Sequence, residues 1–202
     1  SQKRGMKGQY SGLTFWSPNV NIFRDARWGR GQETYGEDPF LSGLIGSAFV
    51  RGLQGSDPNY LKVAACAKHF AVHSGPEADR HHFNAVVSKQ DLYETYLPAF
   101  KTLVEANVEI VMCAYNRLND EPCCGSDDLL SGILRKDWGF KGHVVSDCGA
   151  INDIKSNHKF TISDEESVAY AIKGGVDLNC GDLYRKIPTA VKKGLLSESD
   201  VD

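Results

Sequence analysis

The stretch EIVMCAYNRLNDEPCCGSDDLLSGILRKDWGFKGHVVSDC, residues 109–148, decides which fold we expect for this chain. It contains two apolar runs, Glu109 to Ala114 and His143 to Ser146, with a segment of helical periodicity, Asp128 to Trp138, between them. Both runs are short and nearly continuous in apolar character, which is typical of strands covered on both faces. A strand, a helix and a second strand in this order predict a parallel sheet with helices packed against it.

The same alternation continues on both sides of this stretch. Further strands are expected at Leu13 to Trp16, Lys62 to Ala67 and Val176 to Asn179, and a short one near Asn21 to Phe23. Further helices are expected at Pro39 to Leu53, Asp91 to Ala106, Asp164 to Lys173 and Tyr184 to Lys193. The first of these places Leu41, Leu44, Ile45 and Phe49 on one face. The fold class predicted by the pattern is α/β.

Capping residues mark where several helices begin. Asp38 precedes the first helix as its N-cap, and Ser163 with Glu166 has the spacing of a capping box. Ser197 with Asp200 repeats that spacing, and the chain then stops. We therefore expect a chain cut within a domain, with an uncovered apolar edge where further elements would pack. The length of 202 residues also falls short of the about 250 residues of a complete (β/α)8 barrel.

The composition excludes several classes of protein. With 41% hydrophobic and 24% charged residues and a net charge of -3, the chain has the composition of an ordinary globular protein. It is not basic enough to indicate nucleic-acid binding, and no apolar run reaches the roughly 18 residues of a membrane span. Ser1 to Tyr10 contains basic residues but no apolar segment after them, so no signal peptide is visible.

The six cysteines do not follow a zinc-binding pattern. Cys66, Cys113 and Cys148 lie in or beside apolar runs, and we expect them to be small buried hydrophobic residues. The neighbours Cys123 and Cys124 lie in a loop, where one of them could form a disulfide with a distant cysteine. Histidines and carboxylates also gather between residues 73 and 82, but without tetrahedral spacing. No metal site and no cofactor are expected.

Polar side chains follow the apolar runs. Lys68 and His69 come after one run, Tyr115 after the next and Asp147 after the third, while Arg30 follows the Asn21 to Phe23 segment. The carboxyl ends of parallel strands carry the active site in barrel enzymes. A carboxylate with cations, a histidine and a tyrosine suits a neutral sugar, because hydroxyls bind charged groups and an oxocarbenium-like transition state needs an ionised carboxylate. We expect Lys68 and Arg30 to lower the pKa of Asp147.

Four motifs in fixed order make the sequence resemble glycoside hydrolase family 3. They are RWGRGQETYGEDP (residues 27–39), AKHF (67–70), VMCAYN (111–116) and GFKGHVVSDC (139–148). The SDC triplet, together with HSGPEADRHHF (73–83), resembles the β-xylosidase and β-glucosidase branch. The resemblance implies an incomplete (β/α)8 TIM-type barrel, in which residues 1–202 are part of the family's N-terminal domain, truncated at both ends.

The resemblance also implies a function, a retaining exo-β-glycosidase that hydrolyses terminal non-reducing β-linked sugars of oligosaccharides or aryl glycosides. Asp147 would be the nucleophile. The ligands of the reacting sugar would be Arg30, Lys68, His69, Arg80 and Tyr115. The general acid/base is usually a glutamate from a downstream domain, and an upstream acidic residue usually grips the sugar; neither is visible here. Family resemblance favours a periplasmic or secreted location. The sugar remains open between xylose, glucose and arabinose.

Alternatives remain open for several of these residues. The chain could be a catalytically silent fragment or a carbohydrate-binding remnant that lacks the acid. It could also be a β-N-acetylglucosaminidase, since Asp79 and His81 have the spacing of a histidine-based acid/base dyad in that branch of the family. Arg30 could instead belong to a loop-stabilising charge network with Arg27, Glu33, Glu37 and Asp38. Lys68 and His69 could be buried structural residues.

Overall fold

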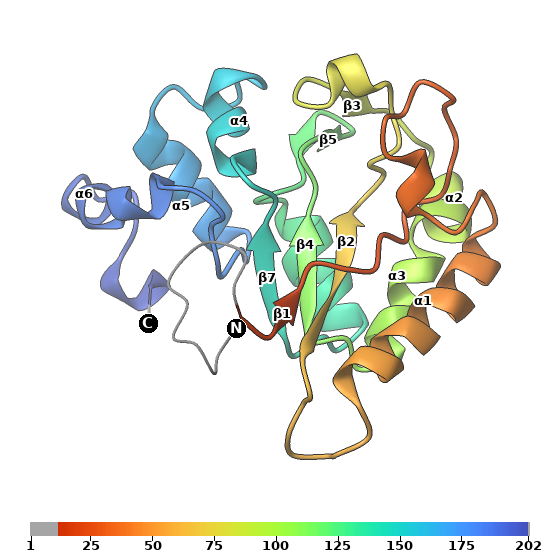
Figure 1. Cartoon of the computed structure of the whole chain (residues 1–202). Helices are drawn as coiled ribbons and strands as arrows, with labels where there is room; N and C mark the ends of the chain where they lie inside the picture. The colour runs from red at the N-terminus through yellow and green to blue at the C-terminus, as the bar shows by residue number, and fades with distance from the viewer. Residues whose placement is uncertain (1–11, 202) are drawn as a thin grey trace.

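A parallel sheet forms the centre of the structure. The computed structural model describes residues 12–201, so the prediction made for Ser1 to Tyr10 lies outside the described residues. Four strands pair in the order β1 (Thr14–Phe15), β2 (Ala64–Phe70), β4 (Ile110–Cys113) and β7 (His143–Ser146), all parallel (Figure 1). The predicted α/β class is confirmed, and β7 has the predicted bounds. The described strands do not close into a barrel.

Helices flank this sheet and share one hydrophobic core with it, while the alternate strand residues Cys66, Ile110, Met112 and Val145 form a separate cluster. Figure 1 shows α1 (Pro39–Gln54) and α3 (Pro98–Glu105) to the right, and α4 (Ala150–Ser156), α5 (Asp164–Lys173) and α6 (Ile187–Lys192) to the left. The short helix α2 (Lys89–Asp91) and a π-helical turn, Leu92–Tyr96, lead into α3, and a second π-helical segment covers Asp128–Asp137. Turns of 3-10 helix occur at Gly31–Glu33, Glu77–Asp79, Leu183–Lys186 and Glu198–Asp200.

The predicted N-terminal caps at Asp38 and Ser163 are confirmed, whereas the helix expected from Tyr184 to Lys193 begins as a 3-10 turn and becomes α6 only at Ile187. The Asp38 carboxylate accepts from the backbone N–H of Leu41 at 2.7 Å, with Pro39 at the first helical position. Ser163 and Glu166 form a complete capping box at the start of α5. The single helix expected from Asp91 to Ala106 is instead divided, because Pro98 has no N–H to continue the helical ladder and begins α3 as a new helix.

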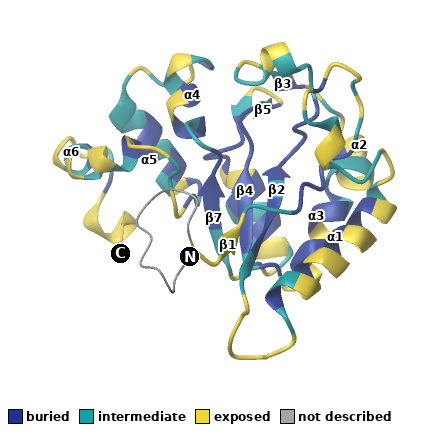
Figure 2. Cartoon of the chain, in the orientation of Figure 1, coloured by how far each residue is buried: buried dark blue, intermediate teal, exposed yellow. Residues whose placement is uncertain are grey.

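The face of α1 that packs is the opposite of the expected one. Leu41, Leu44, Ile45 and Phe49 are exposed, and Figure 2 shows this outer surface in yellow. The buried face carries Ser42, Gly43, Gly46, Ser47, Val50 and Gln54. A Cβ at Gly43 or Gly46 would crowd the side chains of Thr102 and Leu103 on α3. The small residues therefore allow α1 and α3 to approach closely, and the apolar face is left uncovered within the described residues.

Two expected strands do not form. Val176 to Asn179 makes only an isolated bridge, Val145 to Leu178. The reason is Asp177, whose side-chain carboxylate accepts from the backbone N–H of Val144 at 2.6 Å. That N–H is then not available to a backbone carbonyl of residues 176–179, as a regular strand pairing would require. Asn21 to Phe23 is also irregular. Conversely, β2 continues through Lys68 and His69, which were expected just after the strand.

A small second sheet lies above the carboxyl ends of the main strands. It consists of β3 (Asn84–Ala85), β5 (Arg117–Leu118) and β6 (Glu121–Pro122), in that order (Figure 1). β5 and β6 form a hairpin whose two turn residues, Asn119 and Asp120, have φ values of 48° and 73°. Two-residue hairpin turns with positive φ favour asparagine and aspartate. Because β5 follows β4 after three residues, this sheet lies at the carboxyl end of that strand.

Two disulfides correct the expectations for the cysteines. Cys113 pairs with Cys124, and Cys148 pairs with Cys180, with Cα–Cα distances of 5.1 and 4.5 Å. The expectation of small buried residues is right for Cys66, which is a free thiol, and right for the burial of Cys113, although Cys113 is in a disulfide; it is wrong for Cys148, which is bridged and only partly buried. The idea that one loop cysteine bridges to a distant one is confirmed. Among residues 12–201, no helix combines the length and apolar character needed to cross a membrane.

Candidate functional site

The carboxyl ends of β2, β4 and β7 bring several of the predicted residues together. Lys68 and His69 lie at the end of β2, Tyr115 follows β4 and Asp147 follows β7. The Asp147 carboxylate lies 3.6 Å from the ring of His69, which in turn contacts Arg30 at 2.8 Å. Residues that are 117 positions apart along the chain (30 and 147) thus meet at one edge of the sheet.

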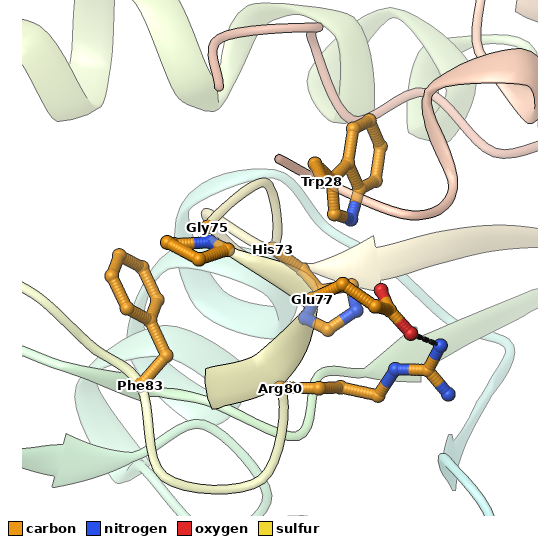
Figure 3. A pocket seen from close by; sticks show the side chains of 7 residues that line it. Trp28, His73, Gly75, Glu77, Arg80 and Phe83 are labelled. Atoms are coloured by element: carbon orange, nitrogen blue, oxygen red, sulfur yellow. Dashed lines mark hydrogen bonds and ion pairs between the residues drawn. The ribbon is translucent and has the colours of Figure 1, made fainter. Parts of the chain in front are cut away.

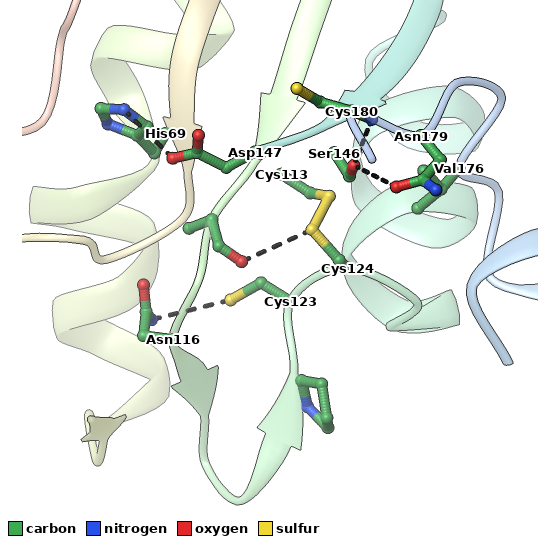
Figure 4. Close-up of a disulfide and its surroundings, with 12 residues drawn as sticks. His69, Cys113, Asn116, Cys123, Cys124, Ser146, Asp147, Val176, Asn179 and Cys180 are labelled. Carbon is green, nitrogen blue, oxygen red and sulfur yellow. Dashed lines mark hydrogen bonds and ion pairs between the residues drawn. A yellow bond between two sulfur atoms is a disulfide. The ribbon is translucent and has the colours of Figure 1, made fainter. Parts of the chain in front are cut away.

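Asp147 is the centre of this group. Its side chain is buried, with the residue 8% exposed. Oδ1 accepts from the backbone N–H of Cys148 at 2.8 Å, while Oδ2 faces His69 Nε2 and makes no hydrogen bond within residues 12–201 (Figure 4). One oxygen is therefore anchored and the other has a free lone pair beside cationic and polar side chains.

The pKa of Asp147 is raised above its ordinary value, and burial is the largest cause. The Cys148 N–H, Arg30, Tyr115 and Lys68 all act in the opposite direction. Arg30 and Lys68 each lower this pKa, as expected, but the expectation that the pKa of Asp147 is low overall is wrong. Loss of solvent outweighs the two cations, so the charge on Asp147 depends on them.

His69 is held in one orientation by Asn21, a residue that the sequence did not single out. Both residues are buried. Asn21 Oδ1 accepts from the His69 backbone N–H at 2.7 Å and contacts His69 Nδ1 at 3.0 Å, and Asn21 Nδ2 donates to the His69 carbonyl at 2.8 Å. Because an amide oxygen only accepts, Nδ1 carries the proton and Nε2 accepts from Arg30 Nη1. The two asparagines within NVN, residues 19–21, inside an apolar run were the available signal.

His69 is neutral. Burial lowers its pKa well below the ordinary value, and His73, Arg30 and Lys68 lower it further. The 3.6 Å contact between His69 and Asp147 is therefore not an ion pair. A neutral histidine also avoids adding a third positive charge next to Arg30 and Lys68.

Arg30 joins the site to a neighbouring carboxylate. Its Nε and Nη2 donate to the two oxygens of Glu33 at 2.7 and 2.8 Å, and Lys68 Nζ lies 3.8 Å from the same carboxylate. The expected wider charge network does not form, because Arg27 pairs with Asp25 and Asp38 caps α1. Burial lowers the pKa of Lys68, with Arg30 next in effect, while Glu33 opposes the shift. Arg30 thus binds Glu33, as the structural alternative required, and its remaining nitrogen faces His69 at the candidate site.

Arg80 lies on the loop after β2 and pairs with Glu77 (Figure 3). Beside it is a cavity of about 10 Å³, lined among others by Trp28 and His73. His73 Nδ1 contacts Asn116 Oδ1 at 3.2 Å, so His73 and Asn116 hold each other. Burial lowers the pKa of His73 to about 4. Figure 3 shows the Arg80 side chain extending beneath Glu77, with His73 behind.

His81 does not form the dyad considered with Asp79. Its Nδ1 lies 2.6 Å from Asp153 Oδ2, on α4, and its ring packs edge-on against Tyr115 at a centroid distance of 4.5 Å. The Asp79/His81 dyad is therefore wrong, because His81 forms its hydrogen bond with the carboxylate of Asp153 instead. The carboxylate of Asp177, which follows Val176, forms an ion pair with Arg135 at 2.6 Å. Within the part of the chain that the structure describes, no group of three or more His, Cys, Asp or Glu is arranged to hold a metal ion.

Known proteins are similar to this sequence. Residues 10–202 match the model of the glycosyl hydrolase family 3 N terminal domain. A xylan 1,4-beta-xylosidase of Xylanibacter ruminicola is 57% identical over 195 residues, which cover 94% of this chain and 23% of that protein. A beta-xylosidase/alpha-L-arabinofuranosidase of Medicago sativa subsp. varia is 47% identical over 95% of this chain and 26% of its own length. The chain thus spans about a quarter of the length of these relatives.

Solved structures share the fold. A GH3 exo-beta-xylosidase in complex with a xylobiose aziridine activity-based probe superimposes with a TM-score of 0.90 at 36% identity, over 94% of this chain and 26% of that one. A β-glucosidase from Erythrobacter marinus gives 0.88 at 33% identity, over 94% of this chain and 26% of that one. The sequence match and the shared fold agree, and the chain belongs to glycoside hydrolase family 3, in whose N-terminal domain it lies.

Proposed function

We propose that the protein containing this chain is a retaining exo-β-glycosidase of the β-xylosidase or β-glucosidase type, with Asp147 as its nucleophile. Residues 1–202 would form part of its N-terminal barrel domain. The observation that carries the proposal is the state of the Asp147 carboxylate. One oxygen is anchored by the Cys148 N–H, and the other has no hydrogen bond within the described residues and lies among Arg30, His69 and Tyr115.

The proposed reaction has two steps. Asp147 Oδ2 forms a bond to the anomeric carbon while the bond from that carbon to the leaving oxygen breaks, and an acid gives that oxygen a proton. Water, deprotonated by the same group, then attacks the anomeric carbon and releases Asp147 and the sugar, with net retention of configuration. Arg30 and Lys68 support the first step because they favour the ionised form of Asp147 against its burial.

The remaining ligands would bind the sugar hydroxyls. Arg30, Lys68 and Arg80 are donors only, and His69 is a neutral ring whose orientation Asn21 sets. Burial raises the pKa of Tyr115, so its hydroxyl stays protonated at neutral pH. Donors of this kind suit the hydroxyls of a neutral ring, which accept as well as donate.

The acid/base is proposed to come from a downstream domain of the same protein. Carboxylates near Asp147 already have cationic or imidazole partners: Glu33 pairs with Arg30, Glu77 with Arg80 and Asp153 with His81. Retaining chemistry needs a second carboxyl about 5 to 5.5 Å from the nucleophile. A segment that lies over the carboxyl end of the sheet could place one there.

Covalent labelling tests the nucleophile. The full-length protein is incubated with a 2-deoxy-2-fluoro-β-xyloside carrying a reactive leaving group, and the labelled peptide is mapped by mass spectrometry. We expect the label on Asp147, no label in Asp147→Asn, and wild-type labelling in the control Asp177→Asn. A label on another residue would refute the role of Asp147. The absence of any adduct in a protein that is folded would favour a catalytically silent remnant.

The sugar is proposed to be xylose in preference to glucose, because the relatives that are 57% and 47% identical carry the name β-xylosidase. The comparison to make is kcat/KM for aryl β-xyloside against aryl β-glucoside and aryl α-arabinofuranoside. A higher value for either of the other two would overturn the preference. It would leave the proposed mechanism in place, because one CH₂OH group alters binding by only about 1 to 3 kcal/mol.

A further inference from the structure

A hydrogen bond between His81 and Asp153 joins two segments that lie on either side of the candidate site. His81 follows Arg80 on the loop after β2, and Asp153 lies on α4, which begins three residues after Asp147. The two side chains approach to 2.6 Å, between His81 Nδ1 and Asp153 Oδ2. The bond therefore connects the loop that carries Arg80 to the helix that follows the proposed nucleophile.

Asp153 is a fixed support for this bond. Its side chain is only 8% exposed, and its other oxygen accepts from Asn157 Nδ2 at 2.5 Å, one helical turn further along. A buried carboxylate that loses a partner has a large desolvation cost. The structure therefore favours the arrangement in which His81 stays on Asp153, although almost half of the His81 side chain is exposed.

His81 contacts the candidate site through the ring of Tyr115. The two rings pack edge to face at 4.5 Å, and the Tyr115 hydroxyl donates to the Cys148 carbonyl at 2.7 Å. The N–H of Cys148 in turn donates to Asp147 Oδ1. A continuous series of contacts thus runs from Asp153 through His81 and Tyr115 to the peptide group next to Asp147.

We propose that His81 and Asp153 form a positioning pair that holds the Tyr115 hydroxyl in place beside Asp147. The pair acts on the reaction through Tyr115 and does not itself touch the reacting atoms. This inference rests on the proposed function. It differs from the Asp79/His81 dyad in both the carboxylate and the role, because here the histidine fixes a neighbouring ring and transfers no proton.

The test is a set of variants of the full-length protein, assayed as kcat and KM for an aryl β-xyloside. We expect His81→Ala and Asp153→Ala each to lower kcat/KM by about 10- to 100-fold, as a displaced catalytic group does. Asp153→Asn keeps an acceptor for His81 Nδ1 and should stay within about threefold of wild type. The decisive measurement is His81→Ala in a Tyr115→Phe background, where we expect less than about a twofold further loss, because the hydroxyl to be positioned is already gone.

Other results would overturn the pair. If His81→Ala lowers kcat/KM by the same factor with and without the Tyr115 hydroxyl, His81 acts by another route, such as direct contact with substrate. If Asp153→Asn is as impaired as Asp153→Ala, the hydrogen bond is not what matters. Thermal denaturation identifies variants that fail to fold, and His81→Phe, which keeps a ring against Tyr115 but cannot reach Asp153 by hydrogen bond, replaces His81→Ala in that case. Failure of the wild type to be labelled at Asp147 would instead refute the proposed function.

Discussion

Replacing Asn21 by alanine should cost more stability and activity than the loss of a small polar side chain usually does. The Asn21 amide makes three contacts with His69, at 2.7, 2.8 and 3.0 Å, and both residues are buried. A buried hydrogen bond contributes about 1 kcal/mol, and a buried group left without a partner costs about 1–3 kcal/mol. Three lost contacts, which leave the His69 backbone N–H, carbonyl and Nδ1 unsatisfied, should lower the free energy of unfolding by about 3–5 kcal/mol.

Activity should fall as well, because Asn21 determines which His69 nitrogen carries the proton. Without the amide oxygen, the proton can move to Nε2, where it would oppose the donor Arg30 Nη1 at 2.8 Å. We expect kcat/KM for an aryl xyloside to drop by at least about tenfold, since small displacements of site groups have effects of that size.

The measurements are urea denaturation and steady-state kinetics of Asn21→Ala in the full-length protein. Asn59→Ala is the matched control, because it deletes the same atoms from an exposed loop position. It should change stability by less than about 0.5 kcal/mol. A loss below about 1 kcal/mol for Asn21→Ala, similar to that of the control, would refute the argument that these hydrogen bonds hold His69.

Three further predictions concern charge, covalent links and packing. Burial raises the pKa of Asp147, and in the proposed mechanism only the ionised carboxylate attacks, so the acid limb of kcat/KM should lie above the ordinary aspartate range. Lys68→Gln should move this limb to higher pH, because a cation that favours the ionised form is lost, while the surface variant Lys192→Gln should not move it. An unmoved limb, or one at lower pH, in Lys68→Gln contradicts the prediction. Replacing Cys148 and Cys180 by serine removes a disulfide that closes a loop with a sequence separation of 32, and should lower the free energy of unfolding by about 4 kcal/mol. The same change at Cys113 and Cys124, whose separation is 11, should lower it by about 3 kcal/mol. Urea denaturation measures both losses, and the reverse order would contradict the loop-entropy reasoning. Gly142→Ala should destabilise the protein by more than about 2 kcal/mol, because the new Cβ would collide with the Glu109 carbonyl. Gly52→Ala, at an open position of α1, should stabilise it by about 0.5–1 kcal/mol in the same assay. Equal effects of the two substitutions would contradict the close approach of Gly142 to Glu109.

The parts of the fold that local pattern controls were predictable. The β7 bounds and the capping boxes follow from residues within a few positions of each other, and the structure has them as expected. The buried face of α1 was not predictable in this way, because periodicity identifies an apolar face and cannot say whether anything covers it. Here the small residues Gly43 and Gly46 decide the contact, since only they let α3 approach.

Side-chain partners distant in sequence explain the remaining errors. Asp177 looks like part of a strand, yet its carboxylate takes the N–H of Val144, 33 residues earlier. His81 lies two positions after Asp79, yet it forms its hydrogen bond with Asp153, 72 positions away. Asn21 was expected only as the start of a short strand, and its contacts with His69, 48 positions away, depend on where β2 lies. The candidate site residues could be named from sequence, while their hydrogen-bond partners could not, because those partners depend on how the strands are stacked.

The geometry around Asp147 depends strongly on the segment that follows β7 by about thirty residues. Cys148 is bonded to Cys180, whose N–H donates to Ser146 Oγ at 3.0 Å (Figure 4). The Cys180 carbonyl accepts from the N–H of Gly149 at 2.8 Å. Three contacts thus hold the residues on both sides of Asp147, although the Asp147 carboxylate itself accepts only one hydrogen bond from residues 12–201. This arrangement lets the carboxylate keep a free oxygen without freedom to move, because its position is set by its neighbours. Both properties suit the proposed nucleophile, because Oδ2 is held in place while its lone pairs are shared with no donor among the described residues and can turn to the anomeric carbon.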